Sequence, residues 1–146
     1  MDYETKRVES EIEIKTFVTK MKHALENGAE ISFQTERIVD TERDEKYTNK
    51  FTIPNLFPDE DPKIVLRREL LSLSYKDYLH TVKDTRFPKK NEMRTFGKTY
   101  NENDDVYIKV RVELINTDYS GQHTVFVMSF HFAEWKFDKS CFPYKD

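Results

Sequence analysis

The sequence predicts an α+β protein in which N-terminal helices pack on an antiparallel sheet that ends in a three-stranded meander. The first observation is a helical spacing of apolar residues behind helix-start signals at Ser10 and Asp61. The second is an unbroken alternation of apolar and polar residues over 106–114. With 146 residues and one cysteine, the chain fits a single domain over 1–146 that needs no disulfide.

The clearest helix is expected behind Ser10. Ser10 and Glu13 form a capping-box pattern, in which each side chain bonds the backbone N–H of the other residue. Asn27-Gly28 supplies a left-handed stop signal. Between them, one apolar stripe at helical spacing is expected to be buried and consists of Ile12, Phe17, Val18, Met21, Ala24 and Leu25.

Two further helices are expected in the middle of the chain. Asp61-Pro62 places an N-cap residue before a proline at the first helical position. The expected buried face of this helix consists of Ile64, Val65, Leu66, Leu70 and Leu71. Ser74 and Asp77 form a second capping-box pattern, which predicts a short helix over 74–79.

The segments around these helices are less regular. Residues 1–9 are charged and have no period, which predicts a loose leader. Alternation over 29–39 predicts a strand. Residues 40–58 are expected to form an irregular insertion, because 40–49 are charged without a period and 51–58 contain two prolines.

The last third of the chain predicts three strands, over 92–100, 106–114 and 124–132. The segments 101–105 and 116–122 between them are rich in the residues that turns prefer. Three consecutive strands joined by short turns form an antiparallel meander.

Strand periodicity brings a candidate site onto one face of this meander. If Val106 and its apolar alternates face the core, then Tyr107, Lys109 and Arg111 share the other face. On the last strand Val127, Ser129 and His131 share a face opposite Phe126, Met128 and Phe130, and either face could point inward. One surface could therefore gather Arg94, Lys98, Tyr107, Lys109 and His131.

Such a surface carries the groups that metal-free RNA cleavage requires. A base must take the 2′-hydroxyl proton, cations must stabilise the phosphorane, and an acid must protonate the leaving oxygen. The same residues also have simpler explanations. Lys109 and Arg111 fit ordinary solvent-facing charges, Tyr107 fits a packed strand residue, and a lone histidine is more often structural than catalytic.

Charge is unevenly distributed along the chain. The formal net charge is −3, but the stretch 83–98 carries six basic and two acidic residues and so contributes +4. A basic stretch on an acidic body indicates either a polyanion site or a solvated loop. No apolar run is long enough to span a bilayer, and the N-terminus lacks a signal pattern, so a cytoplasmic protein is expected. No metal-ligand spacing or phosphate-binding glycine loop is present, and no cofactor is expected.

Several short motifs in this order resemble the MqsR-type toxins (motility quorum-sensing regulators), whose fold is similar to that of the RelE ribonucleases. The resemblance covers most of 12–135 and is carried by 73–78 (LSYKDY), 96–98 (FGK), 106–109 (VYIK) and 128–134 (MSFHFAE). It implies the toxin of a bacterial type II toxin–antitoxin pair, a metal-independent mRNA endoribonuclease held inactive by a co-encoded antitoxin protein.

The resemblance also implies site residues. Tyr107 matches the family's strand tyrosine and Lys109 follows it in the same Tyr-x-Lys motif. His131 and His80 stand at two positions where the family has functional basic residues. A further working side chain is implied on the strand through Arg94 and Thr95.

The resulting hypothesis gives each candidate a role. His131 is the general acid or base, Tyr107 orients or donates, and His80 is a second proton-transfer or phosphate group. Both histidines are expected to gain charge as the pH falls toward 6. The expected phosphate-binding residues are Lys109, Arg94, Lys98 and Lys83. The antitoxin is expected to cover the basic face with acidic residues.

Two other hypotheses remain open at this point. One is a relative without catalytic activity that binds single-stranded RNA through Phe96, Tyr107 and the same basic face. The other is a structural or regulatory partner protein that uses its acidic leader and insertion as the contact surface.

Overall fold

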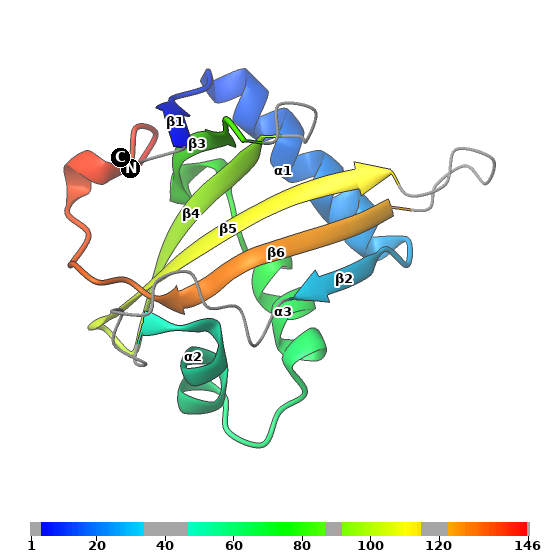
Figure 1. The fold of residues 1–146 in the computed structure, drawn as a ribbon, viewed down its shortest axis with the longest axis vertical. Coiled ribbons are helices and arrows are strands. Elements are labelled where there is room, and N and C mark those ends of the chain that lie inside the picture. The colour runs from blue at the N-terminus through cyan, green and yellow to red at the C-terminus, as the bar shows by residue number, and fades with distance from the viewer. Residues whose placement is uncertain (1–3, 34–46, 87–91, 115–122, 146) are drawn as a thin grey trace.

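The structure is a computed structural model that describes residues 4–33, 47–86, 92–114 and 123–145 (Figure 1). Its helices are α1 (Glu11–Glu26), α2 (Asn49–Leu56) and α3 (Pro62–Leu71), with short 3₁₀ turns at Tyr75–Asp77 and Lys139–Cys141. Its strands are β1 (Glu4–Arg7), β2 (Glu30–Phe33), β3 (Tyr78–Asp84), β4 (Met93–Tyr100), β5 (Asp104–Leu114) and β6 (His123–Phe132).

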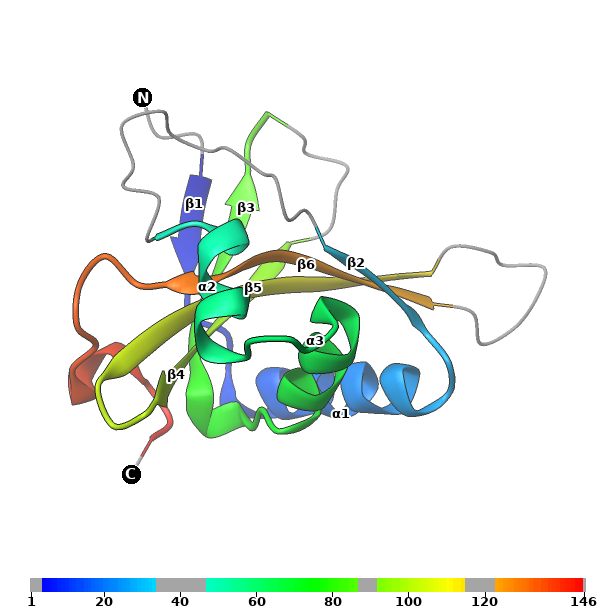
Figure 2. The ribbon, with the colours of Figure 1, turned by 90° about the horizontal axis from the view of Figure 1, so that it is seen from below.

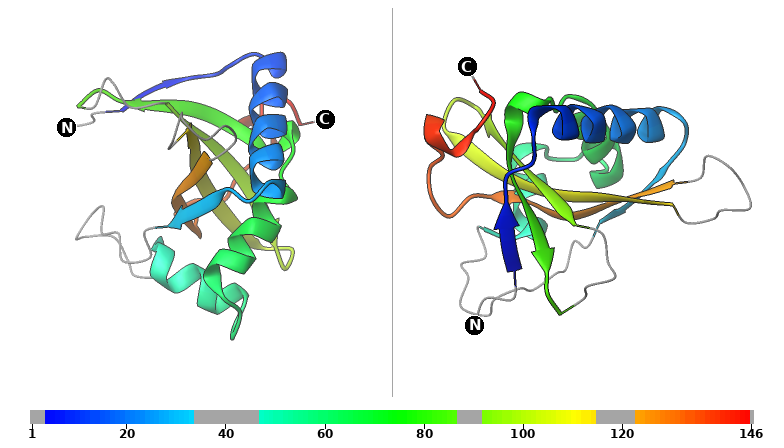
Figure 3. Two further views of the ribbon diagram at one scale, coloured as in Figure 1. Left: turned by 90° about the vertical axis from the view of Figure 1, so that its right-hand side faces the viewer. Right: turned by 90° about the horizontal axis from the view of Figure 1, so that it is seen from above.

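Within the described residues, six strands form one sheet in the order β1-β3-β4-β5-β6-β2. Every neighbouring pair is antiparallel except β2 and β6, which run parallel. Helices α1 and α3 cover one face of the sheet, as Figures 2 and 3 show. The α+β class and the β4-β5-β6 meander are therefore as predicted. No helix in the described part of the chain is long and apolar enough to cross a membrane.

Helix α1 forms as its capping signals predict. The Ser10 hydroxyl accepts from Glu13 N at 3.2 Å, and the Glu13 carboxylate accepts from Ser10 N at 3.1 Å. Gly28 follows the helix with φ +85°, a left-handed conformation that glycine adopts without a steric cost. The buried stripe contains Ile14 instead of Ile12, which is 75% exposed, because two residues turn a helix by about 200°.

Helix α3 begins at the predicted cap, where the Asp61 carboxylate accepts from Lys63 N at 2.8 Å. Its buried residues are Val65, Leu66 and Leu70, whereas Ile64 is 65% exposed. The short helix predicted over 74–79 is wrong beyond its first turn. The capping box at Ser74 is present, but it begins a 3₁₀ turn that ends at Asp77.

Tyr78 is extended because tertiary contacts favour the strand. It pairs with Phe96 on β4, and its fully buried ring packs edge-on against the Phe96 ring. Its hydroxyl lies 2.7 Å from the hydroxyl of Thr81. Burial of an aromatic ring with a bonded hydroxyl outweighs the local preference for a helix.

The leader expected at 1–9 is not loose where the structure describes it. Residues 4–7 form β1, which pairs with β3 from Glu4 opposite Asp84 to Arg7 opposite Thr81. The insertion expected at 40–58 is also more regular than predicted, because 49–56 form α2 with Pro54 inside it. The predicted strand over 29–39 is present as β2, and its remainder lies outside the described residues, as do most of the 40–49 loop and the turn over 116–122.

Helix α2 continues the hydrogen bonding of the sheet edge where β2 ends. The Asn49 amide donates to Met128 O and accepts from Phe130 N, both at 3.0 Å. One turn later the Thr52 hydroxyl accepts from Phe132 N at 2.9 Å. Two side chains thus bond the backbone groups of β6 that a neighbouring strand would otherwise bond.

Replacing Asn49 with alanine is expected to lower the free energy of unfolding by about 2–3 kcal/mol, because two backbone groups of β6 lose their partner. Asn55→Ala, at an exposed position of the same helix, is the matched control and is expected to change stability by less than about 0.5 kcal/mol. Urea denaturation of both variants measures the difference, and equal stabilities would contradict the role of Asn49.

Candidate active site on the sheet face opposite the helices

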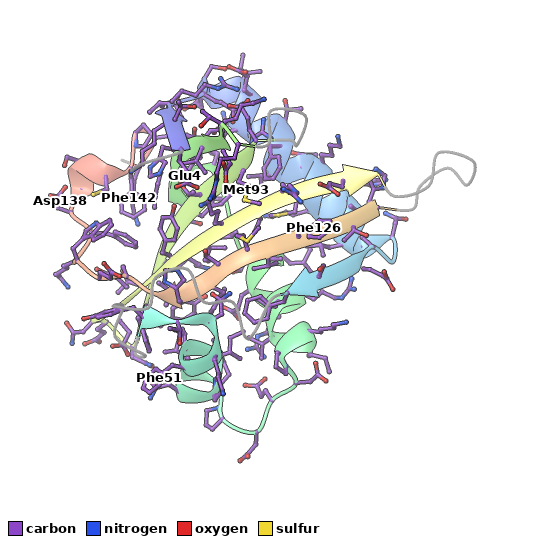
Figure 4. All side chains as sticks on the ribbon, viewed as in Figure 1. Glu4, Phe51, Met93, Phe126, Asp138 and Phe142 are labelled. Atoms are coloured by element: carbon purple, nitrogen blue, oxygen red, sulfur yellow. The ribbon has the colours of Figure 1, made fainter. Side chains whose placement is uncertain are left out.

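The sheet has a helix face, which α1 and α3 cover, and a far face on its other side. On β5, Val106, Ile108 and Val110 are fully buried on the helix face. Because side chains alternate along a strand, Tyr107 and Lys109 lie on the far face. The alternation predicted for this strand is confirmed. Figure 4 views the molecule from the far side, with Glu4, Met93 and Phe126 labelled.

Two bulges decide which residues of the neighbouring strands reach the far face. On β6, Lys109 pairs with Ser129 but Val110 pairs with Val127, so Met128 is an extra residue. The predicted alternation over 124–132 is therefore wrong: Val127 lies on the helix face, while Ser129 and His131 lie on the far face. Side chains alternate regularly on each side of Met128, but the extra residue reverses which of them point to the far face.

The second bulge lies on β3. Tyr78 pairs with Phe96 and His80 pairs with the adjacent Thr95, which makes Leu79 the extra residue. Without it, Tyr78 and His80 would share a face. The bulge leaves Tyr78 in the core and turns His80 to the far face.

Register then arranges the candidates in two neighbouring rows across the sheet. The lysine row crosses four strands and consists of His80, Thr95, Lys109 and Ser129. The tyrosine row crosses three strands and consists of Gly97, Tyr107 and His131. Directly opposite residues have Cβ atoms about 5 Å apart, and neighbouring rows on one face are about 7 Å apart. All four predicted catalytic residues thus lie in one small area.

Tyr107 and His131 form the closest pair in this area. Their ring centroids are 5.7 Å apart and the rings are tilted by 30°. His131 Nδ1 lies 3.0 Å from Phe132 O. Since a carbonyl oxygen only accepts, this bond requires a proton on Nδ1. In the neutral ring the lone pair is consequently on Nε2, the atom that can take a proton.

Lys109 is buried in an ion pair. Its side chain is 9% exposed, and Nζ donates to Glu4 Oε2 at 2.6 Å. Strand β1 brings Glu4 to this point by pairing with β3. The Lys109 ammonium group, which was predicted to bind phosphate, is therefore already paired with a carboxylate.

His80 is neutral at physiological pH. Burial lowers its pKa to about 4, and the charges of Lys6 and Lys109 act in the same direction. Its Nε2 atom is buried without a hydrogen-bond partner. The expectation that His80 gains charge near pH 6 is therefore wrong. A neutral imidazole can accept a proton but cannot serve as a cation for phosphate.

Arg94 and Lys98 lie on the helix face, not with the catalytic candidates. The register places Arg94 opposite Val110 and Lys98 opposite Val106, both in the core. Arg94 binds Glu9 through two hydrogen bonds of 2.8 and 2.9 Å. Lys98 Nζ donates to the hydroxyl of Ser72 at 2.7 Å.

The rest of the described basic stretch does not supply the site either. Lys83 lies on the same side of β3 as Thr81, which is opposite Arg94 on the helix face. Arg86 binds the carboxylate of Asp84. Lys83, Arg94 and Lys98 thus do not share the far face with Tyr107 and His131, and Arg86 is bound to Asp84, which lies opposite Glu4 at the end of β3.

Sequence reasoning missed two residues and left a third ambiguous. Lys6 and Glu4 reach the far face through β1, a run of four charged or polar residues with no apolar alternation to identify it. Thr95 is the residue of β4 that faces the site. Its hydroxyl donates to His80 O at 2.7 Å and accepts from His80 N at 3.2 Å, which fixes the position of that histidine.

The described residues contain no group of three His, Cys, Asp or Glu side chains that could hold a metal ion. A surface hollow of about 370 Å³ lies between the end of α1 and the start of α3, away from both rows. Arg67 in its wall donates to the carbonyls of Leu25 and Ala29 and so serves the packing of α1. We assign no ligand to this hollow.

The geometry can therefore do acid–base chemistry beside a buried cation. A tyrosine hydroxyl and an imidazole lie together in one row, and an ammonium and a neutral imidazole lie in the next. In comparisons with known proteins, no family model, no curated protein and no solved structure matches the chain.

Proposed function

We propose that this chain is a metal-independent endoribonuclease, the toxin of a bacterial type II toxin–antitoxin pair that acts on mRNA in the cytoplasm. The observation that carries the proposal is the Tyr107–His131 pair, with ring centroids 5.7 Å apart, next to Lys109 and His80 on one sheet face. The resemblance of the surrounding motifs to MqsR-type toxins supports it. Thr95, which faces His80 and Lys109, lies on the strand where the resemblance implies a further working side chain.

The proposed reaction is transfer of an RNA phosphodiester to its own 2′-hydroxyl. His131 Nε2 takes the 2′-hydroxyl proton while the 2′-oxygen forms a bond to phosphorus. The bond from phosphorus to the 5′-oxygen breaks, and the Tyr107 hydroxyl protonates that oxygen. Lys109 stabilises the charge of the phosphorane. Solvent then returns a proton to Tyr107 and removes one from His131.

Bulges of the kind found on β3 and β6 are common next to active sites, where they re-aim side chains. Tyr78 on β3 and Val127 on β6 are buried on the helix face. With regular alternation from these residues, His80 and His131 would also lie on the helix face, and each bulge instead puts one histidine on the same face as Lys109. Both bulges bring a histidine to the same area of the far face, which favours a functional role for this arrangement.

The proposal is tested with purified protein and single-stranded RNA in the presence of EDTA. Cleavage is expected to continue without metal and to produce 2′,3′-cyclic phosphate and 5′-hydroxyl ends. These ends follow from attack by the 2′-oxygen and departure of the 5′-oxygen. If the RNA remains intact after incubation with folded protein that is free of antitoxin, the proposal is refuted.

A relative that binds RNA or protein without catalysis is the second candidate. It is favoured by the burial of the central residues, since Lys109 is 7% and His131 is 8% exposed. A site of this kind must open before a phosphate reaches it. RNA binding without cleavage products under the conditions above would establish this alternative.

The carboxylate of Glu4 competes with a phosphate for Lys109. Glu4→Gln is therefore expected to lower the KM for RNA by about threefold to tenfold, because it removes the negative charge that is paired with the Lys109 ammonium group. Glu26→Gln, the same charge change at the end of α1, is the control and is expected to leave KM unchanged. Equal KM values for the two variants would show that Glu4 does not compete.

A further inference from the structure

The segment after β6 forms a loop that is fixed at both ends to one residue. Ala133 N donates to Asp105 O at 2.9 Å, which adds one more bond to the β5–β6 ladder. Phe137 N donates to the Asp105 carboxylate, also at 2.9 Å. Trp135 lies midway between these two bonds, so its backbone is held in place although it belongs to no helix or strand.

This loop borders the tyrosine row. Asp105 precedes Tyr107 by two residues on β5, and its side chain is on the same far face about 7 Å away. The Phe137 ring lies directly over Gly97, where an added Cβ would approach Phe137 Cε2 to 2.7 Å. Gly97 pairs with Tyr107. The glycine thus allows the loop to lie against the sheet immediately beside the Tyr107–His131 pair.

Trp135 differs from the other aromatic residues of this segment because it is exposed. Phe137 and Phe142 pack edge to face with centroids 5.7 Å apart, and Tyr144 stacks on Tyr78 at 6.1 Å. Trp135 is 63% exposed. An indole that is exposed on a fixed loop presents a rigid apolar plane, which loses little conformational entropy when a flat ligand stacks on it.

We infer that Trp135 is a specificity residue that stacks on a nucleobase of RNA bound at the Tyr107–His131 pair. The inference rests on the proposed ribonuclease function and names how its substrate is held. Every base offers a face for stacking, but only unpaired and unstacked bases can place it on a protein side chain. Trp135 therefore selects single-stranded RNA and positions a base next to the scissile phosphate. Lys136, which follows it and is exposed, supplies a cation for the adjoining backbone.

The chain contains one tryptophan, so emission excited at the long-wavelength edge of the spectrum, where tyrosine does not absorb, reports on Trp135 alone. The probe is a single-stranded hexaribonucleotide with 2′-methoxy groups, which binds but cannot form the cyclic phosphate. Its titration into the full-length protein is expected to quench the emission in a saturable way. A duplex of the same sequence is expected to leave the emission unchanged.

Kinetics with the unmodified hexaribonucleotide complete the test. Trp135→Ala is expected to raise KM by about tenfold or more with little change in kcat, and Trp135→Phe to restore most of the affinity. Because the side chain is exposed, both variants are expected to keep the wild-type circular dichroism. If Trp135→Ala fails to fold, the Trp135→Phe kinetics and the wild-type quenching still decide the matter.

The outcomes separate this inference from the function on which it rests. Cleavage by the wild type without quenching, and with equal KM in the variants, would overturn the role of Trp135 and leave the ribonuclease intact. Equal quenching by the duplex would overturn the selection for unstacked bases. A wild type that neither cleaves nor binds RNA would overturn the proposed function and the inference with it.

Discussion

Replacing His131 by alanine is expected to lower the rate of RNA cleavage by about 10²–10⁴-fold, the usual contribution of a general base. The physical reason is that the lone pair of the neutral His131 ring is on Nε2, because Nδ1 is bonded to Phe132 O, and that this ring lies 5.7 Å from the Tyr107 ring. Single-turnover cleavage of a labelled oligoribonucleotide measures the effect on the chemical step. In bacteria the same variant is expected to lose growth arrest and mRNA fragmentation.

Two further variants make this prediction decisive. His131→Asn keeps a donor near the position of Nδ1 and controls for loss of the hydrogen bond to Phe132 O. It is expected to be as inactive as His131→Ala. His123→Ala changes a histidine at the other end of β6 and is expected to keep full activity. Wild-type rates in a folded His131→Asn protein would remove His131 from the mechanism.

Replacing Glu9 by alanine is expected to cost about 3–5 kcal/mol of the free energy of unfolding, the usual effect of breaking a buried ion pair. Glu9 is 3% exposed and accepts hydrogen bonds from Arg94 and from the Thr81 hydroxyl. Without the carboxylate, the Arg94 guanidinium loses its partner between α1 and the sheet. Urea denaturation followed by circular dichroism measures the change.

A surface ion pair of the neighbouring helix is the matched control. Glu11 and Lys15 are both 48% exposed and form an i,i+4 pair at 3.3 Å. Glu11→Ala is expected to cost less than about 0.5 kcal/mol. The double variant Glu9→Leu/Arg94→Met, which removes both charges together, is expected to recover much of the lost stability. A Glu9→Ala protein as stable as Glu11→Ala would refute the structural role of this carboxylate.

The pH dependence of stability is expected to change with Glu9. Burial acts to raise its pKa, but hydrogen bonds from Arg94 and Thr81 outweigh burial, so the pKa lies below the ordinary 4.5. A carboxyl with a lowered folded pKa stabilises the fold above its unfolded pKa and loses that contribution as the pH falls through the folded value. The wild type is therefore expected to lose stability below about pH 4.5 more steeply than Glu9→Ala.

Local signals in the sequence were sufficient for much of the fold. The capping box at Ser10, the N-cap at Asp61 and the alternation over β5 depend on contacts within a few residues of the chain. These are the interactions that sequence patterns record directly. The same patterns placed Tyr107 and Lys109 correctly on one face.

Pairing between residues far apart in the sequence determined the structure of segments that local patterns could not predict. Strand β1 has no apolar alternation, and it forms because residues 4–7 pair with β3 some 75 residues later. Asn49 and Thr52 bond the edge of β6 across a similar separation. Neither partner is visible in the local sequence, so the leader and the insertion were predicted to be irregular.

The sequence by itself determined the helix-start positions, the strands of the meander and the residue types of the candidate site. Only the tertiary structure decided how those residues meet. A bulge of one residue reverses the face of every side chain beyond it, and bulges at Leu79 and Met128 turn His80 and His131 toward Lys109. The β4–β5 register placed Arg94 and Lys98 opposite core residues on the helix face. The sequence could not show this, because which side of a strand is buried depends on the packing of the whole sheet.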